Sequence, residues 1–302
     1  LGCHSATPRV NAFPTAQYLE INNEHFLIDC GEGTQRQMRK YKVGFSKISH
    51  IFISHLHGDH FYGLVGLLST YGMLSREKEV HVYGPKGIKQ VTLLMLKTSQ
   101  SHAKYPIIFH ELSSKESEQI YESDKVVVKT IPLRHRVYTN GYLFIEKEKP
   151  KNLHMQNINN YAEIDRADYL NIKAGKDITL STGEIVPNSE LTIPPKKPLK
   201  YAFCSDTCFK PDIIPIIEKV DLLYHEATFL AEREDLAIKT KHSTALQAAT
   251  IARDADVKQL VLGHFSGRYK DTSLFENEAK KVFENTLLAE PGKMFTLSNT
   301  DS

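Results

Sequence analysis

Short β-rich runs alternate along this chain with segments of helical periodicity, and this alternation limits the fold more than any other feature. HIFIS at 50–54 is followed by DHFYGLVGLLST at 59–70, and VHVYGPKG at 80–87 is followed by IKQVTLLMLK at 88–97. Further strand patterns lie at 126–133, 201–205, 221–227 and 259–265, and helical patterns at 211–220, 243–255 and 274–287. Such alternation predicts an α/β protein. A chain of 302 residues suffices for one large α/β domain or two small ones.

The segment SHLHGDH at 54–60 places three histidines and an aspartate directly after an apolar run. His55 and His57 are two residues apart, so in an extended chain their side chains point the same way. Asp59 and His60 follow at the turn into the predicted helix. Imidazole and carboxylate groups suit zinc and similar divalent ions. A polar turn after a strand would explain one histidine, but four such groups in a strand-turn-helix context favour a metal site.

Three more candidate ligands follow other predicted strands. His135 comes after VVVKTIPL, Asp206 after YAFCS, and His264 after QLVLG. In open α/β sheets, sites form outside the carboxyl ends of the strands, so these side chains can meet the SHLHGDH cluster in one cleft. Each of them alone also fits a polar residue in a turn at a strand end.

Composition excludes several classes of protein. No stretch approaches the ~18 apolar residues of a membrane span, and no leader resembling a signal peptide is visible. Four cysteines do not make a disulfide framework at this length, so we expect an intracellular, cytoplasmic protein. A net charge of +2 leaves the partner open.

The stretch from Glu146 to Lys200 breaks the α/β rhythm. It is polar, poor in apolar periodicity and basic at its end, in PPKKPLK. A structureless loop of this length is unusual in a compact domain unless it is functional. We therefore expect a single domain over residues 1–302 that includes an inserted, protruding arm at 146–200.

The motifs resemble those of the metallo-β-lactamase superfamily, and within it the short form of the tRNase Z family. HLHGDH, His135 in LRHRV, Asp206 in SDT and His264 in GHFSGRY carry the first resemblance. DCGEGTQRQMRK, HEATF, KHSTALQAATIA and HFSGRY carry the second, which covers essentially the whole chain. The resemblance implies an αββα sandwich of two mixed β-sheets flanked by helices. The arm lacks the Gly-Pro-rich stretch of many bacterial members.

The resemblance implies a site with two zinc ions per chain, with manganese or iron as alternatives. Such a pair of cations neutralises a phosphodiester and lowers the pKa of a shared water. The implied ligands are His55, His57 and His135 on one ion, Asp59, His60 and His264 on the other, and Asp206 between them. Asp59 would also orient the attacking water.

The resemblance also implies a general acid, because the departing 3′ oxygen must be protonated. His242 of HST would donate this proton, with Glu226 of HEAT as its carboxylate partner. A helix start with Ser243 as its N-cap is the structural alternative for KHSTALQ, and both interpretations can hold together. Arg268 of HFSGRY could contact a substrate phosphate or form a surface salt bridge.

The implied function is zinc-dependent endoribonucleolytic removal of the 3′ trailer of precursor tRNA after the discriminator nucleotide, by a homodimer without a membrane partner. Another hydrolase of the superfamily, such as a small-molecule phosphodiesterase or arylsulfatase, is one alternative, which would not need HEAT, HST or the arm. An inactive RNA-binding relative is another, although such a protein would be expected to have lost ligands.

Overall fold

The computed structural model describes residues 1–7, 9–101 and 103–297. The described chain forms two compact units. The core unit comprises Leu1–Ile145 and Lys200–Leu297, and the inserted unit comprises Glu146–Leu199.

The first sheet of the core unit has five strands in sequence order: β1 (Gln17–Ile21), β2 (Glu24–Ile28), β3 (His50–Phe52), β4 (Val80–Pro85) and β5 (Ile107–Leu112). β1 and β2 are antiparallel, whereas β2 to β5 are parallel. Parallel neighbours need a crossover connection, usually helical. The predicted alternation of strands and helices supplies it through α2 (Gly58–Met73) and α3 (Ile88–Thr98).

The second sheet has seven strands in the order β16 (Thr286–Leu288), β15 (Leu260–Gly263), β14 (Leu222–Glu226), β13 (Lys200–Cys204), β8 (Asn140–Glu146), β7 (Val126–Pro132) and β6 (Gln119–Glu122). β13 to β16 are parallel, and β13 pairs with β8 in the antiparallel sense. Both sheets are therefore mixed, and the predicted fold class is confirmed.

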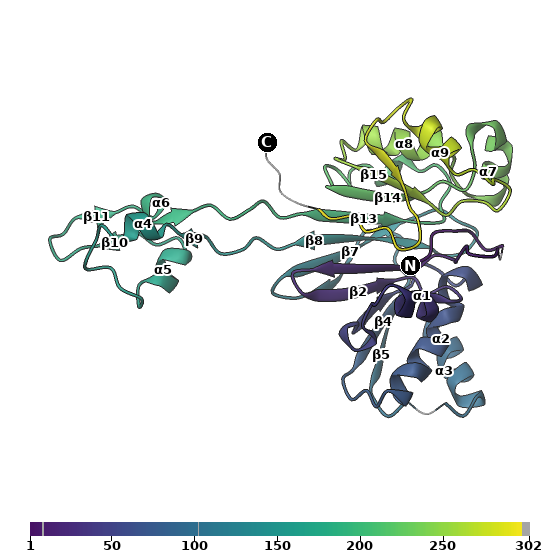
Figure 1. The fold of residues 1–302 in the computed structure, drawn as a ribbon, viewed down its shortest axis with the longest axis horizontal. Helices are drawn as coiled ribbons and strands as arrows, with labels where there is room; N and C mark the ends of the chain where they lie inside the picture. The colour runs from purple at the N-terminus through teal and green to yellow at the C-terminus, as the bar shows by residue number, and fades with distance from the viewer. Residues whose placement is uncertain (8, 102, 298–302) are drawn as a thin grey trace. The chain divides into compact units, whose positions relative to one another are not determined.

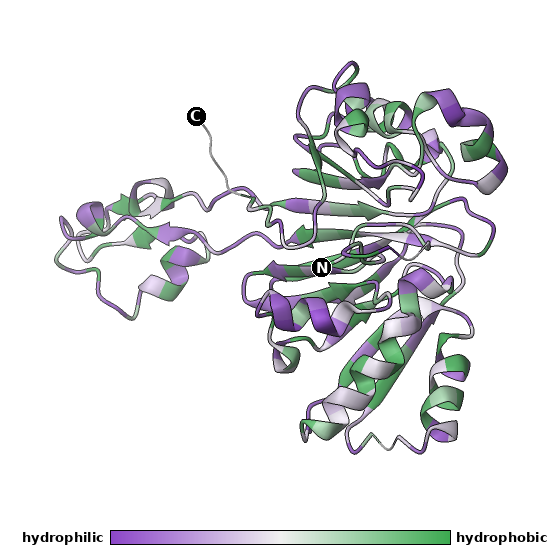
Figure 2. Ribbon diagram, turned by 45° about the vertical axis from the view of Figure 1, so that its right-hand side comes forward, coloured by the Kyte–Doolittle hydropathy of each residue, from purple (hydrophilic) through white to green (hydrophobic). Residues whose placement is uncertain are grey.

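Helices cover the outer face of each sheet, which gives four layers in the core unit (Figure 1). α1 (Thr34–Lys40) packs with α2 and α3 against the first sheet. α8 (Ala245–Asp254) and α9 (Ser273–Ala279) pack against the second, and α7 (Glu234–Thr240) lies close before α8 in the chain. Hydrophobic residues are frequent along the strands of both sheets in Figure 2. Within the described part of the chain, no helix has the length and apolar character that crossing a membrane requires.

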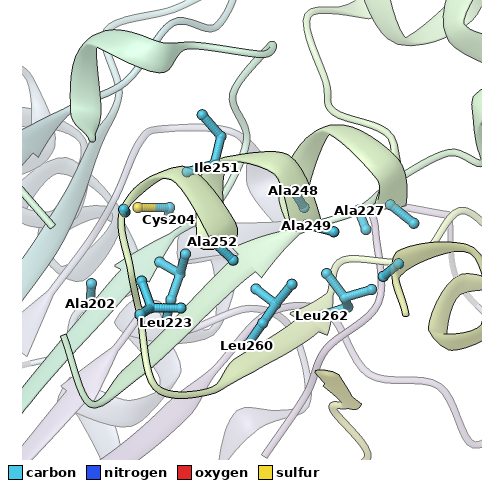
Figure 3. Close-up of a cluster of buried hydrophobic side chains, with 14 of the residues drawn as sticks. Ala202, Cys204, Leu223, Ala227, Ala248, Ala249, Ile251, Ala252, Leu260 and Leu262 are labelled. Carbon is cyan, nitrogen blue, oxygen red and sulfur yellow. The ribbon is translucent and has the colours of Figure 1, made fainter. Parts of the chain in front are cut away.

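Two kinds of packing hold these layers together. Aromatic side chains fill the space between the sheets, among them the fully buried Phe26, Phe52 and Phe144. Small side chains bring α8 close to the second sheet, because Ala249 and Ala252 face the strands (Figure 3). This close approach fixes the start of α8, which borders the site described below.

The inserted unit has its own small core of Ile158, Ile164, Ile172, Val186 and Leu191. Its buried Asn188 donates from Nδ2 to the carbonyls of Ile172 and Lys176. Its elements are short: β9 (Asn152–Leu153), α4 (Met155–Ile158), α5 (Tyr169–Lys173), β10 (Ile178–Thr179), β11 (Ile185–Val186), α6 (Asn188–Leu191) and β12 (Thr192–Ile193).

Candidate metal centre

The ends of four strands carry the seven residues that the sequence suggested as metal ligands. SHLHGDH begins two residues after β3 and continues into α2, whose first turn contains Asp59. His135 follows β7, Asp206 follows β13, and His264 follows β15 directly. The structure brings all seven together in the core unit, in two neighbouring groups.

The first group joins three histidines to one carboxylate. One potential ligand atom of each of His55, His57, His135 and Asp206 lies within 4.8 Å of those of the other three. The Nε2 atom of His55 is 3.0 Å from Nδ1 of His57, and Nε2 of His135 is 3.2 Å from the same atom. The second group consists of Asp59, His60 and His264 within the same 4.8 Å.

Asp206 lies between the two groups and turns one oxygen toward each. Its Oδ1 is 3.2 Å from Nε2 of His60 and 3.2 Å from Nε2 of His264. Its Oδ2 is 3.5 Å from Nε2 of His55. A carboxylate in this position suits a bridging ligand between two cations, which is the role implied for Asp206 by the family resemblance.

The donor atoms fit metal ions. Nε2 of His60 and Nε2 of His264 are buried. Each lies 3.2 Å from Oδ1 of Asp206, but neither makes a hydrogen bond within the described part of the chain. A buried polar atom without a partner is unfavourable, and a cation would satisfy both nitrogens. Burial lowers the pKa of His55, which leaves a neutral imidazole able to ligate. Burial alone would raise the pKa of Asp206, but the imidazoles around it hold that pKa well below its usual value.

The backbone at the site adopts an uncommon conformation. Asp206, His264 and Asp29 have φ angles of 57°, 60° and 57°. Residues other than glycine seldom adopt the left-handed region, and such strain gathers at functional sites. The three turns bring side chains from the strand ends close to the ring of His60.

Asp29 is a member of the site that our sequence analysis missed. It follows β2, is fully buried, and its Oδ2 lies 2.7 Å from Nδ1 of His60. Ser54 donates to the same carboxylate from its backbone nitrogen, at 2.7 Å, and from its hydroxyl, at 2.9 Å. A carboxylate on the second nitrogen fixes the tautomer and the orientation of a metal-binding histidine. Its position directly after the apolar run FLI is the sequence signal that could have revealed it.

Other ligand histidines are oriented in the same manner. The carbonyl of Lys241 accepts from Nδ1 of His135 at 2.9 Å. Nδ1 of His264 is 2.9 Å from the hydroxyl of Thr228, which donates to Glu226. The Nδ1 atoms of these rings are thereby engaged, and their Nε2 atoms face the site.

His242 and Glu226 form a hydrogen-bonded pair beside the two groups. Oε1 of the fully buried Glu226 is 2.8 Å from Nδ1 of His242. Burial alone would lower the pKa of His242, but the charge and the hydrogen bond of Glu226 outweigh it and raise the pKa to about 9. The imidazole ring centroid of His242 is 5.3 Å from that of His264. A ring nitrogen of His242 also lies within 4.8 Å of a potential ligand atom of Asp206 and of one of His264, so the pair borders the metal-ligand groups.

Two predictions made from the sequence concern Ser243 as a helix N-cap and Arg268 as a phosphate ligand. The N-cap of α8 is Thr244, within a capping box with Gln247, and not Ser243. The Ser243 hydroxyl instead donates to the carbonyl of Thr207, because the helix begins one residue later. Arg268 is exposed in the turn after β15, and its guanidinium pairs with no carboxylate of the described residues. Its contact with a substrate phosphate stays a prediction.

Comparison with known proteins shows which proteins this chain is similar to. A family model described as Anti-Pycsar protein Apyc1 matches residues 1–149, slightly less than half of the chain. The ribonuclease Z of Bacteroides thetaiotaomicron is 44% identical over 299 residues, which cover 99% of this chain and 94% of that protein. The ribonuclease Z of Phocaeicola vulgatus is 46% identical over 289 residues, which cover 96% and 93%.

Solved structures agree with these relatives. Human tRNase Z, short form, has a TM-score of 0.69 and 27% identity, and the match covers 96% of this chain and 94% of that one. The metallo-β-lactamase fold protein YhfI of Bacillus subtilis has a TM-score of 0.66 at 18% identity, covering 97% and 95%, which supports the fold alone. The family resemblance drawn from the motifs is therefore confirmed: this chain belongs to the ribonuclease Z family and is a nuclease with the metallo-β-lactamase fold.

Proposed function

We propose that this protein is a zinc-dependent endoribonuclease that removes the 3′ trailer of precursor tRNA. It cuts after the discriminator nucleotide and leaves a 3′-hydroxyl on the tRNA. The nearly full-length similarity to ribonuclease Z proteins supports the reaction class. The main observation behind the proposal is that the His242–Glu226 pair lies beside the two groups of candidate metal ligands.

The two groups around Asp206 would hold two cations, with zinc proposed and manganese or iron as alternatives. The first ion would be held by His55, His57 and His135, and the second by Asp59, His60 and His264, with Asp206 shared. When bound, the pair supplies charge neutralisation at the phosphodiester and activates the attacking water.

Side chains of the protein perform the remaining steps. Asp59, in the first turn of α2, accepts a hydrogen bond from the attacking water and orients it toward the phosphorus. His242 donates a proton to the departing 3′ oxygen, and Glu226 stabilises the imidazolium that makes this donation. Arg268 is proposed to hold a substrate phosphate.

The remaining partners follow from the same proposal. We expect a homodimer that acts on precursor tRNA in the cytoplasm, with the inserted unit contacting the folded RNA. A small-molecule phosphodiesterase or arylsulfatase of the same superfamily is the alternative. The presence of Glu226 of HEAT and His242 of HST as a hydrogen-bonded pair favours the RNA reaction, because that alternative does not need them.

The decisive experiment uses end-labelled precursor tRNA and maps the cut. We expect one cut after the discriminator nucleotide. His242→Ala should keep its metal, measured by elemental analysis, while single-turnover cleavage slows by roughly 10²–10⁴, the usual contribution of a general acid. Cleavage of a small phosphodiester without cleavage of precursor tRNA would support the alternative instead.

A further inference from the structure

A hollow of about 370 Å³ adjoins His242 in the core unit. Its walls include the basic side chains of Arg134 and Lys241 and the apolar side chains of Phe209 and Ile238. The mechanism above uses none of these four. We name this hollow the Phe209 pocket.

The Phe209 pocket shares a wall with the candidate metal centre. Arg134 directly precedes His135, and the backbone carbonyl of Lys241 accepts the hydrogen bond from the ring of His135. The ring centroid of His242 is 4.9 Å from that of His135. A substrate group bound in the pocket would therefore lie next to the scissile phosphate.

The chemical character of the walls suits a nucleotide. The side chain of Phe209 is 37% exposed and that of Ile238 is 67% exposed, so each offers apolar surface to a ligand. Aromatic side chains bind nucleobases by stacking, with little dependence on sequence. Arg134 and Lys241 are exposed, and within the described ranges neither forms an ion pair with a carboxylate. The one acidic group of the wall, Glu234, already accepts a hydrogen bond from Gln247 at 2.8 Å.

We propose that the Phe209 pocket binds the nucleotide on the 5′ side of the cut, with its base against Phe209. This assignment rests on the proposed function, because His242 protonates the 3′ oxygen of that nucleotide. The nucleoside that carries this oxygen must lie against His242, and His242 lines the Phe209 pocket. Arg134 and Lys241 contact the next phosphate upstream, and such contacts fix the register of the strand without reading its sequence.

The test compares two precursor tRNAs that differ only in an abasic site at the nucleotide before the cut. For the unaltered protein, removal of this base should lower single-turnover kcat/KM by about 5- to 100-fold, the range that base–aromatic stacking gives. Phe209→Ala should show a loss of similar size on the intact precursor and almost no further loss on the abasic one. Phe209→Tyr should restore the response to the base.

Control variants separate this pocket from a general defect. Leu274→Ala removes another partly exposed apolar side chain, in α9, and should cut both precursors as the unaltered protein does. Circular dichroism and zinc content should be the same for all variants. Full cleavage of the intact precursor by Phe209→Ala, or an undiminished effect of the abasic site in that variant, would overturn the pocket alone. If the unaltered protein cuts neither precursor, the proposed function fails and the pocket assignment fails with it.

Discussion

Asp29 shows how strongly a single buried carboxylate can govern a neighbouring ligand. It accepts two hydrogen bonds from Ser54 and faces Nδ1 of His60, so it holds that ring in one orientation. Burial raises the pKa of Asp29, although His60 and the hydrogen bonds from Ser54 act to lower it. The orientation of His60 therefore depends on a residue that would bind no metal itself.

We predict that Asp29→Asn weakens metal binding by about 10- to 100-fold, the usual effect of removing the partner of a metal-binding histidine. Competition with a chromophoric chelator measures this affinity. Asp221→Asn is a matched control, because Asp221 is also buried but lies directly before β14, where its carboxylate pairs with Lys258 at 2.7 Å. That variant should lose stability and keep its metal affinity. Equal metal affinity in both variants would contradict the role of Asp29.

Site residues that are close in the chain could be predicted from the sequence, whereas contacts between distant residues could not. His55, His57, Asp59 and His60 are close in the chain, so their shared geometry follows from a strand and a turn. The link between Thr228 and His264 joins residues that are 36 positions apart, and it exists only after β14 and β15 have paired. Neither residue type nor spacing reveals such a contact beforehand.

At the level of elements, the strands were predicted more accurately than two of the helices. Residues 211–220 have a helical pattern, yet only Pro211–Ile213 forms a short 3-10 helix. Pro215 explains the difference, since proline lacks the backbone N–H and restricts the residue before it. In the pattern at 274–287, α9 stops at Ala279. Residues 286 and 287 belong to β16 instead, because pairing with β15 overrides their helical propensity.

His50 of β3 is partly buried beside histidines of β4 and β5, and these surroundings disfavour its protonated form. His50 of β3 pairs with His81 of β4 in the sheet, and their ring centroids are 4.9 Å apart. The ring centroid of Tyr121 is 4.5 Å from that of His50. Burial, reinforced by His81 and His110, lowers the pKa of His50 to about 4. His50 therefore stays neutral in the folded protein at pH values where the unfolded chain is protonated.

We predict that the low pKa of His50 makes the folded protein less stable in acid. The unfolded chain binds a proton at His50 below about pH 6.5 and the folded protein does not, so unfolding becomes more favourable as pH falls from there toward 4. The loss approaches about 1.4 kcal/mol per pH unit. Urea unfolding at pH 7.5 and pH 5.0, with zinc in excess, measures it. In His50→Phe the difference between the two pH values should shrink, and an unchanged difference would show that other groups cause it.

At the scale of the whole molecule, the charge of the inserted unit is unevenly distributed. Residues 146–199 contain eight Lys and Arg and eight Asp and Glu. The two connecting segments, 146–151 and 194–199, carry five lysines against two glutamates, whereas the lobe at 152–193 carries three basic and six acidic residues. Since phosphate contacts depend on Lys and Arg, the lobe is poorly suited to them and the connecting segments are well suited.

We therefore predict that the connecting segments, and not the lobe, hold the RNA backbone. Neutralising Lys149 and Lys196 with the double substitution Lys149→Gln and Lys196→Gln should raise KM for precursor tRNA several-fold. It should also reduce the slope of log affinity against log salt by about two. Hydrolysis of bis-p-nitrophenyl phosphate should survive, because that substrate needs only the metal cleft.

The lobe supplies the matched control for this prediction. Lys173 and Lys176 are exposed like Lys149 and Lys196, but acidic residues outnumber basic ones around them in the lobe sequence. Lys173→Gln combined with Lys176→Gln removes the same charge, and we expect little change in KM or in salt dependence. If this control weakens binding as much as the first pair, the lobe contacts the RNA despite its charge. If neither pair changes KM, the prediction that the connecting segments hold the RNA backbone is wrong.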